Sequence, residues 1–229
     1  MIIYDIIGGK QMRNSFIEKL NQLNNDLIKM GGLVEDAIKN AAKALEEDDV
    51  ELAKKIIAGD SLVNEAEKKI ESQSLNIILR EQPVAGDLRK VSAALKMVTD
   101  MERIADNAAD IAEIIVTANV KSILHISASI TEMAEKASRM VGDAVKSFVD
   151  VDLELAQQVV ERDDEVDALF NEIKTILIEN ISHDKSNVDI IVDTIMIIKY
   201  FERIADHAVN ICEWVYFFET GEYKSTQII

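Results

Sequence analysis

The chain of 229 residues contains one proline and eight glycines, with 48% hydrophobic and 29% charged residues, a composition that favours long helices over turn-rich folds. Aromatic residues make up only 5% of the chain, which argues against a β-sandwich or a β-barrel. The net charge of -17 repels nucleic-acid phosphates and anionic lipid headgroups, so we expect neither nucleic-acid binding nor direct membrane insertion.

Helix start and stop signals predict six long helices joined by short connections. Asp48, Asp49 and Glu51 form an N-terminal capping pattern for the second helix, and Pro83 suits the first turn of the third. Short connections between long amphipathic helices favour antiparallel neighbours and therefore helical bundles. The predicted helices cover residues 12–47, 50–80 and 83–118, and the last three begin at Ser122, at Asp150 or Asp152, and at Ser186.

The two halves of the chain repeat each other. The pentapeptide Glu-Arg-Ile-Ala-Asp at residues 102–106 recurs at residues 202–206, and a match of five residues at this separation is rare by chance. Apolar positions around both copies also correspond. The sequence therefore predicts an all-α protein of two tandem antiparallel three-helix bundles, residues 1–118 and 119–229.

An acidic stripe follows the pentapeptide on both helices. With about 100° of rotation per residue, the acids fall on one helix face, in line with apolar residues. The third and sixth helices are also apolar on their opposite faces, so we expect them to lie centrally, where the two bundles meet. The stripe residues are Glu102, Asp106 and Asp110 on the third helix and Glu202, Asp206 and Asn210 on the sixth.

Other helices offer polar residues that could face these stripes. Each of two pairs has i, i+4 spacing, which places both side chains on one helix face. Carboxylates in line with a packed seam are costly unless their pKa rises or cations neutralise them. The candidates are Asp60 with Asn64, Asp163 with Asp167, and the single residues Asp36 and Asp143 on the first and fourth helices.

A solvated acidic face is the alternative to a cation site. Arg103 can pair with Asp106 at i+3, and Lys96 can pair with Asp100 at i+4. Acidic faces of this kind are common on soluble helices. The spacing of the acids leaves both interpretations open.

The ligand types restrict which metal could bind. Oxygen-only clusters suit iron, manganese, magnesium or calcium, whereas structural zinc prefers cysteine and histidine. The chain has no Glu-x-x-His pair of the kind found in ferritin-like di-iron sites. A binding role is therefore favoured over a redox enzyme.

Targeting signals and disulfides are not expected. Residues 1–7 carry no basic stretch and no cleavage site, so no secretory signal is predicted. The apolar stretch 190–201 is too short to span a membrane and is broken by Asp193 and Lys199. Cys212 is the single cysteine, which fits a reducing compartment. We expect a cytoplasmic protein.

The motif pattern resembles the PhoU family of phosphate-transport regulators. Residues 82–89, Gln-Pro-Val-Ala-Gly-Asp-Leu-Arg, are followed by the pentapeptide at 102–106 and its copy at 202–206. The resemblance covers nearly the whole chain, and the doubled motif is its specific part.

This resemblance implies two similar three-helix bundles whose Glu/Asp-x-x-x-Asp motifs bind metal, including multinuclear iron clusters in some members. The motif falls on Glu102 with Asp106 and on Glu202 with Asp206, and 163–167 also matches it. Two positions depart from this pattern. Asn64 stands four residues after Asp60, where the motif has an aspartate, and Asn210 stands where the first half has Asp110.

The resemblance also implies a regulatory role. Family members act with the phosphate-specific ABC transporter and its sensor histidine kinase, and restrain uptake and starvation signalling when phosphate is ample. We therefore expect a non-enzymatic negative regulator, cytoplasmic and reaching the inner face of the membrane through protein partners. A carboxylate-bridged iron oxidase or storage protein and a metal-free helical adaptor are the alternative functions. Among partners, we also expect that a second copy of the chain could form a homodimer.

Overall fold

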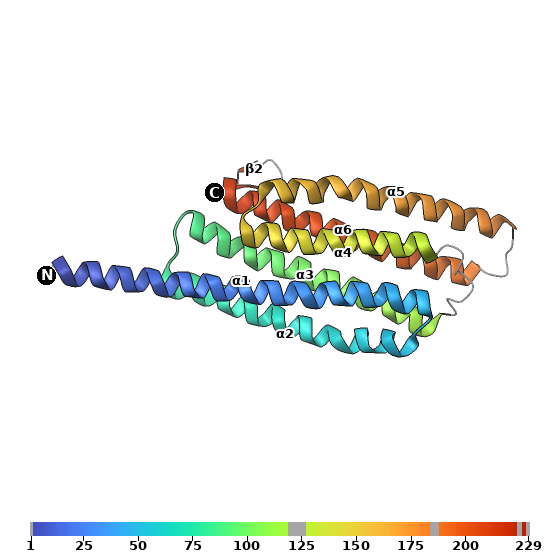
Figure 1. Ribbon diagram of the computed structural model, residues 1–229, viewed down its shortest axis with the longest axis horizontal. Coiled ribbons are helices and arrows are strands. Elements are labelled where there is room, and N and C mark those ends of the chain that lie inside the picture. Colours follow the sequence, from blue (N-terminus) through green and yellow to red (C-terminus); the bar gives the residue numbers. More distant parts are fainter. Residues whose placement is uncertain (1, 119–126, 184–187, 224–225, 228–229) are drawn as a thin grey trace.

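The computed structural model describes residues 2–118, 127–183, 188–223 and 226–227. Six helices lie lengthwise beside one another, with α2 and α5 on the outside (Figure 1). The predicted all-α class is confirmed, with one short addition: β1 (Glu222–Tyr223) pairs antiparallel with β2 (Thr226–Gln227) after the last helix. The helices are α1 (Ile2–Glu47), α2 (Val50–Glu81), α3 (Gly86–Thr117), α4 (Ser127–Asp150), α5 (Leu153–His183) and α6 (Val188–Thr220).

The helices form two groups of three. Helices α1, α2 and α3 pack on one another, as do α4, α5 and α6. Between the groups, α3 packs against α6 in the most extensive helix pairing, and α1 packs against α4. The central position predicted for α3 and α6 is therefore confirmed. The predicted division between residues 118 and 119 lies at the edge of the described part of the chain and stays a prediction.

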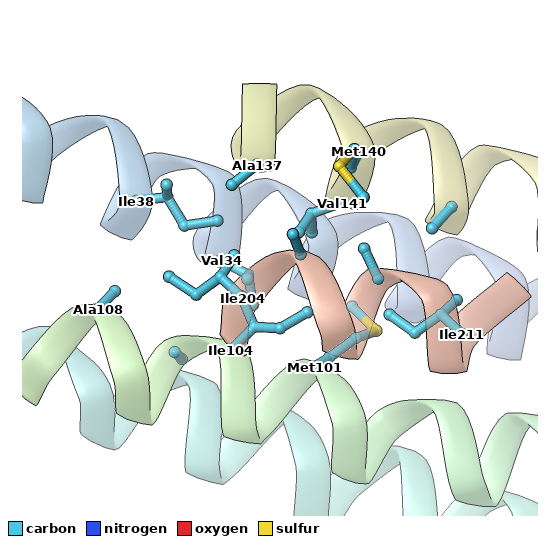
Figure 2. Close-up of a cluster of buried hydrophobic side chains, with 14 of the residues drawn as sticks. Val34, Ile38, Met101, Ile104, Ala108, Ala137, Met140, Val141, Ile204 and Ile211 are labelled. Carbon is cyan, nitrogen blue, oxygen red and sulfur yellow. The ribbon is translucent and has the colours of Figure 1, made fainter. Parts of the chain in front are cut away.

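The hydrophobic core runs through both groups without a break. Val34 and Ile38 of α1 meet Ile104 of α3, Val141 of α4 and Ile204 of α6 at its centre (Figure 2). All five side chains are fully buried. Burial of this apolar surface is the main force that holds the two halves together.

Two aspartates start helices as the sequence predicts. Asp49 accepts a hydrogen bond from the backbone N–H of Leu52 at 2.9 Å, and Asp152 accepts one from Leu155 at 2.9 Å. Each satisfies a backbone donor that the first turn of a helix leaves free. The residue before each aspartate, Asp48 in the first half, has a left-handed backbone, so the repeat extends into the connections.

Two predicted helix starts are wrong. Helix α1 begins at Ile2 and not at Met12, because extending an existing helix costs far less than nucleating one, and this segment runs past the other helices (Figure 1). Pro83 lies in the connection before α3, which begins at Gly86. Proline disfavours helical backbone in the residue before it, and Gln82 is left-handed, with φ 50°.

The remaining starts are partly outside the described residues. Ser122 and Ser186 lie outside the described residues, and α4 and α6 are described from Ser127 and Val188. In the described parts of the chain, no helix combines the length and the apolar character needed to cross a lipid bilayer.

Candidate metal centre

The first acidic cluster lies between α2 and α3. Glu102, Asp106 and Asp110 stand on successive turns of α3, and Asp60 on α2 faces them closely enough for their charges to perturb it. Burial raises the pKa of Asp60, and the negative charges of Asp106 and Asp110 raise it further. The stripe and its facing residue are thus brought together as predicted.

The carboxylate of Asp60 is only half satisfied. The amide of Asn64 donates a hydrogen bond to Oδ2 of Asp60 at 2.7 Å, which favours the charged form and opposes the rise in pKa. Its other oxygen, Oδ1, is buried and has no hydrogen-bond partner among the residues that the structure describes. A buried unpaired oxygen of a carboxylate is costly, so this atom is suited to a cation.

Glu67 belongs to this cluster and is absent from the sequence prediction. Burial raises the pKa of Glu67, and the charge of Glu102 raises it further. Burial also raises the pKa of Glu102, with Asp106 as the next cause. Glu67 lies seven residues after Asp60, which returns it to the same helix face, so the helical spacing carried a signal that could have identified it.

Part of the first cluster is solvated, in line with the alternative interpretation. Arg103 contacts Glu102 at 3.5 Å and Asp106 at 3.0 Å. The side chain of Asp106 is 37% exposed and that of Arg103 is 56% exposed, whereas Glu102 is 17% exposed. Exposed pairs of this kind contribute about 0 to 1 kcal/mol, so Arg103 offsets only part of the acidic charge.

Asp36 reaches the edge of this cluster. A cleft of about 210 Å³ between α1 and α2 is lined by Asp36, Asp60, Gly59 and the exposed Lys55. Asp36 itself is exposed, so it stands at the rim of the cleft and not in the packed seam.

The second acidic cluster lies between α5 and α6. Burial raises the pKa of Asp163 to about 6, helped by the charges of Asp206, Asp167 and Glu202. Oδ1 of Asp163 is buried and, within the described ranges, without a hydrogen-bond partner. Asp163, Asp167, Glu202 and Asp206 therefore lie near one another, as predicted. Like Asp60, Asp163 has a raised pKa and a buried, unpaired carboxylate oxygen.

Two predicted ligands of the second half are engaged elsewhere. Asp143 forms an ion pair with Arg162. Asn210 donates through Nδ2 to Oδ1 of Asp100 on α3 at 3.3 Å. Neither Arg162 nor Asp100 figures in the sequence prediction of a site, because each contact joins two different helices and depends on how those helices pack.

Asp100 connects α3 to α6 at the centre of the molecule. Besides Asn210, it accepts hydrogen bonds from Nδ1 of His207 at 2.9 Å and Nε1 of Trp214 at 3.2 Å. The predicted pairing of Asp100 with Lys96 is replaced by these contacts across the interface. Donors from the other half of the chain therefore stabilise the negative charge of Asp100.

The donor chemistry of both clusters fits a hard cation, but no coordination sphere is already assembled. Sets of carboxylate oxygens suit iron, manganese, magnesium or calcium. In the described part of the chain, no group of three or more histidine, cysteine, aspartate or glutamate side chains converges closely enough to hold one metal ion. Cation binding would therefore require these side chains to change rotamer.

The fold and these paired acidic clusters define a class of helical protein built from a doubled three-helix unit. A model of the PhoU domain matches residues 27–115 and again residues 130–215. The chain therefore belongs to the PhoU family.

Proteins of known family are similar in sequence to this chain over nearly its whole length. A phosphate-specific transport system accessory protein PhoU homolog from Clostridium acetobutylicum is 36% identical over 92% of this chain and 96% of its own length. A homolog from Thermotoga maritima is 32% identical, covering 90% of each chain. These relatives are named accessory proteins and not enzymes, as expected.

Two solved structures of PhoU proteins have the same fold as this chain. PhoU from Streptococcus pneumoniae, described as a phosphate transport system regulatory protein, superposes with a TM-score of 0.84 at 26% identity, covering 91% of this chain and 98% of its own. PhoU from Pseudomonas aeruginosa gives a TM-score of 0.77 at 29% identity, covering 90% and 100%. The expected fold of two related three-helix bundles is confirmed.

Proposed function

We propose that this chain is an accessory protein of a phosphate-specific transport system and regulates phosphate uptake. Family membership over nearly the full length supports this role, because the matching relatives carry that description. The partners would be the phosphate-specific ABC transporter and its sensor histidine kinase, and the place of action the cytoplasmic face of the membrane. The regulation would be negative, restraining uptake and starvation signalling when phosphate is ample.

The same proposal includes a bound cation, with iron as the leading candidate and manganese, magnesium or calcium as alternatives. The observation that carries it is the buried, unpartnered Oδ1 of Asp60, matched among the described residues by that of Asp163. A bound cation would neutralise acids that otherwise repel one another. In the first half, Asp60, Glu67, Glu102 and Asp106 would hold it, with Asp110 beside them.

A metal-free helical adaptor is the second candidate. The ion pairs of Arg103 with Glu102 and Asp106 favour it, since they already provide positive charge on the solvent side. In that case the melting temperature should not respond to a chelator, because only a ligand bound by the folded state stabilises it.

Metal analysis of protein purified without chelator distinguishes these candidates. We expect bound iron or manganese in the wild type and a clear loss in the variant Glu102→Gln/Asp106→Asn. Exposed Glu65 and Asp87 provide a matched control, since Glu65→Gln/Asp87→Asn removes the same charge away from the cluster. Equal metal content in all three proteins would count against the first cluster.

The regulatory role needs a separate test. The tagged full chain should retain the transporter from solubilised membranes, and retention should differ between cells grown with ample and with scarce phosphate. Failure to retain the transporter under either condition would contradict the accessory role, whatever the metal content. A ferroxidase assay on the same protein would test the iron oxidase alternative directly.

A further inference from the structure

The cleft between α1 and α2 has a filled counterpart in the second half of the chain. The alignment of the two halves pairs Asp36 of α1 with Asp143 of α4. It also pairs Gly59 of α2 with Arg162 of α5, each directly before an aspartate of an acidic cluster. In the second half, Nη1 of Arg162 donates to Oδ2 of Asp143. In the first half, a glycine stands where the side chain of that arginine would begin.

The first half has room for the side chain that Gly59 lacks. A Cβ added at Gly59 would meet no atom within 4 Å. Gly59 and Asp36 both line the cleft of about 210 Å³ between α1 and α2. Asp36 forms no ion pair with any residue that the structure describes. The acid of the pair is therefore present in the first half, and the chain does not supply its cation.

The size and lining of the cleft indicate one long side chain as its occupant. Small-molecule sites usually enclose about 300 to 1,000 Å³, which is more than this cleft offers. Its walls include the apolar residues Ile56 and Val63, and its acids are Asp36 and Asp60. An arginine combines an apolar stem with a planar cation that pairs with a carboxylate through two parallel hydrogen bonds. Arginine therefore suits the apolar walls and the acids together.

The rim of the cleft is more apolar than the fold requires. Leu62 of α2 lines the cleft and is 54% exposed, whereas its equivalent in the second half is Glu165, which pairs with Lys136. Leu33 of α1 lines the cleft and is 36% exposed, whereas its equivalent Met140 is fully buried. These two leucines provide apolar contacts for residues on either side of an inserted arginine.

Charge favours a basic partner. Among the described residues that line the cleft, Lys55 is the one cation. Lys55 is exposed, so solvent and salt screen its repulsion of a second cation. The net charge of -17 attracts a basic surface and opposes contact with a second copy of the chain.

We propose that this cleft is a docking site for an arginine side chain of a protein partner, which Asp36 would bind as Asp143 binds Arg162. The inference rests on the proposed accessory role, which supplies the partner, a subunit of the phosphate-specific transporter. It requires no bound metal. Because the second half supplies its own arginine, the site belongs to the first half alone.

Gly59→Arg tests this, because it gives the first half the arginine of the second. The added side chain should pair with Asp36 and fill the cleft. Replacing a glycine within a helix also favours the helix, so we expect a folded protein. Retention of the transporter from solubilised membranes by the tagged full chain should fall at least about tenfold. Asp36→Asn leaves the cleft open but removes the acid, and should cause a similar loss.

Two control variants separate the cleft from general effects. Gly59→Ala also favours the helix but does not fill the cleft, and Ser72→Arg adds the same charge at an exposed position of α2. Both should retain the transporter like the wild type. Undiminished retention by Gly59→Arg or by Asp36→Asn, or an equal loss in either control, would overturn the inference and leave the accessory role intact. If the wild type retains no transporter, the accessory role fails with it.

Urea denaturation tests the cleft without a partner. Arginine has a slightly lower helix propensity than alanine, so propensity alone would give Gly59→Arg the lower urea midpoint of the two variants. We expect the higher midpoint for Gly59→Arg, because the added arginine pairs with Asp36. This advantage should disappear when Asp36→Asn is added to both variants. A midpoint for Gly59→Arg at or below that of Gly59→Ala would show that the cleft does not accept an arginine.

Discussion

Asp60 on α2 and Asp163 on α5 are equivalent residues of the two halves, and each has a buried Oδ1 without a hydrogen-bond partner among the described residues. In both, burial is the main cause of a raised pKa, followed by the charge of an aspartate in the repeated pentapeptide. Two independent copies of one unfavourable arrangement indicate that the arrangement belongs to the fold.

Asp163→Asn should stabilise the metal-free protein at neutral pH. Burial raises the pKa of Asp163 to about 6, above its value in the unfolded chain. The folded state therefore holds the proton more tightly, and the free energy of unfolding falls as the pH rises from about 4 to about 6. With allowance for solvent screening of this partly exposed group, we expect a gain of about 1 kcal/mol at pH 7.

Urea denaturation with chelator present, from about pH 4 to about pH 7, measures this effect. The stability difference between Asp163→Asn and the wild type should shrink towards the acid end of the series. Exposed Glu172 on the same helix is the matched control, and Glu172→Gln should follow the wild type. A variant less stable than the wild type at neutral pH would show that Asp163 makes a favourable interaction as an anion.

Asp100→Ala should weaken the contact between the two halves. It removes the acceptor shared by His207, Asn210 and Trp214 and leaves partly buried donors unpaired. We expect a loss of about 2 to 3 kcal/mol in the free energy of unfolding. Trp214 is the single tryptophan, so its fluorescence reports on this contact directly. Exposed Thr99 is the control, and equal effects of Thr99→Ala and Asp100→Ala would contradict the prediction.

Arg89→Ala should loosen the end of α6. Nε of Arg89 donates to the backbone carbonyl of Phe218 at 3.0 Å, in the last turn of that helix. The guanidinium of Arg89 satisfies a carbonyl that has no partner within the helix, and its positive charge interacts favourably with the negative end of the helix dipole. We expect a loss of about 1 kcal/mol, with faster amide exchange confined to the end of α6. Arg80→Ala, at an exposed arginine of α2, should leave exchange in α6 unchanged.

Ile104→Ala should destabilise both halves together. Ile104 is fully buried where α1, α3, α4 and α6 meet (Figure 2), so its removal leaves a cavity in the shared core. Substitutions of this type cost about 2 to 5 kcal/mol. Calorimetry should show one transition at a lower temperature. Ile28 of α1 is 50% exposed, so Ile28→Ala is the control. Two separated transitions would contradict a shared core.

The helix starts show which local features could be predicted. Asp49 and Asp152 cap helices as expected, because capping depends on residues within one turn. Pro83 failed as a start signal, since its fixed φ suits an extended connection as well as a first turn. The helical period could have predicted that Glu67 lies on the same face as Asp60. It could not predict that Glu67 lies near Glu102, because Glu102 belongs to another helix.

The sequence by itself determined the helical class, the doubled unit, the central place of α3 and α6, and the face on which the acids gather. These follow from spacing along one helix and from comparison of one half with the other. The tertiary structure decided which acids have partners. Arg162 reaches Asp143 and Asn210 reaches Asp100 across helix interfaces, and the register between packed helices depends on how all their side chains fit together.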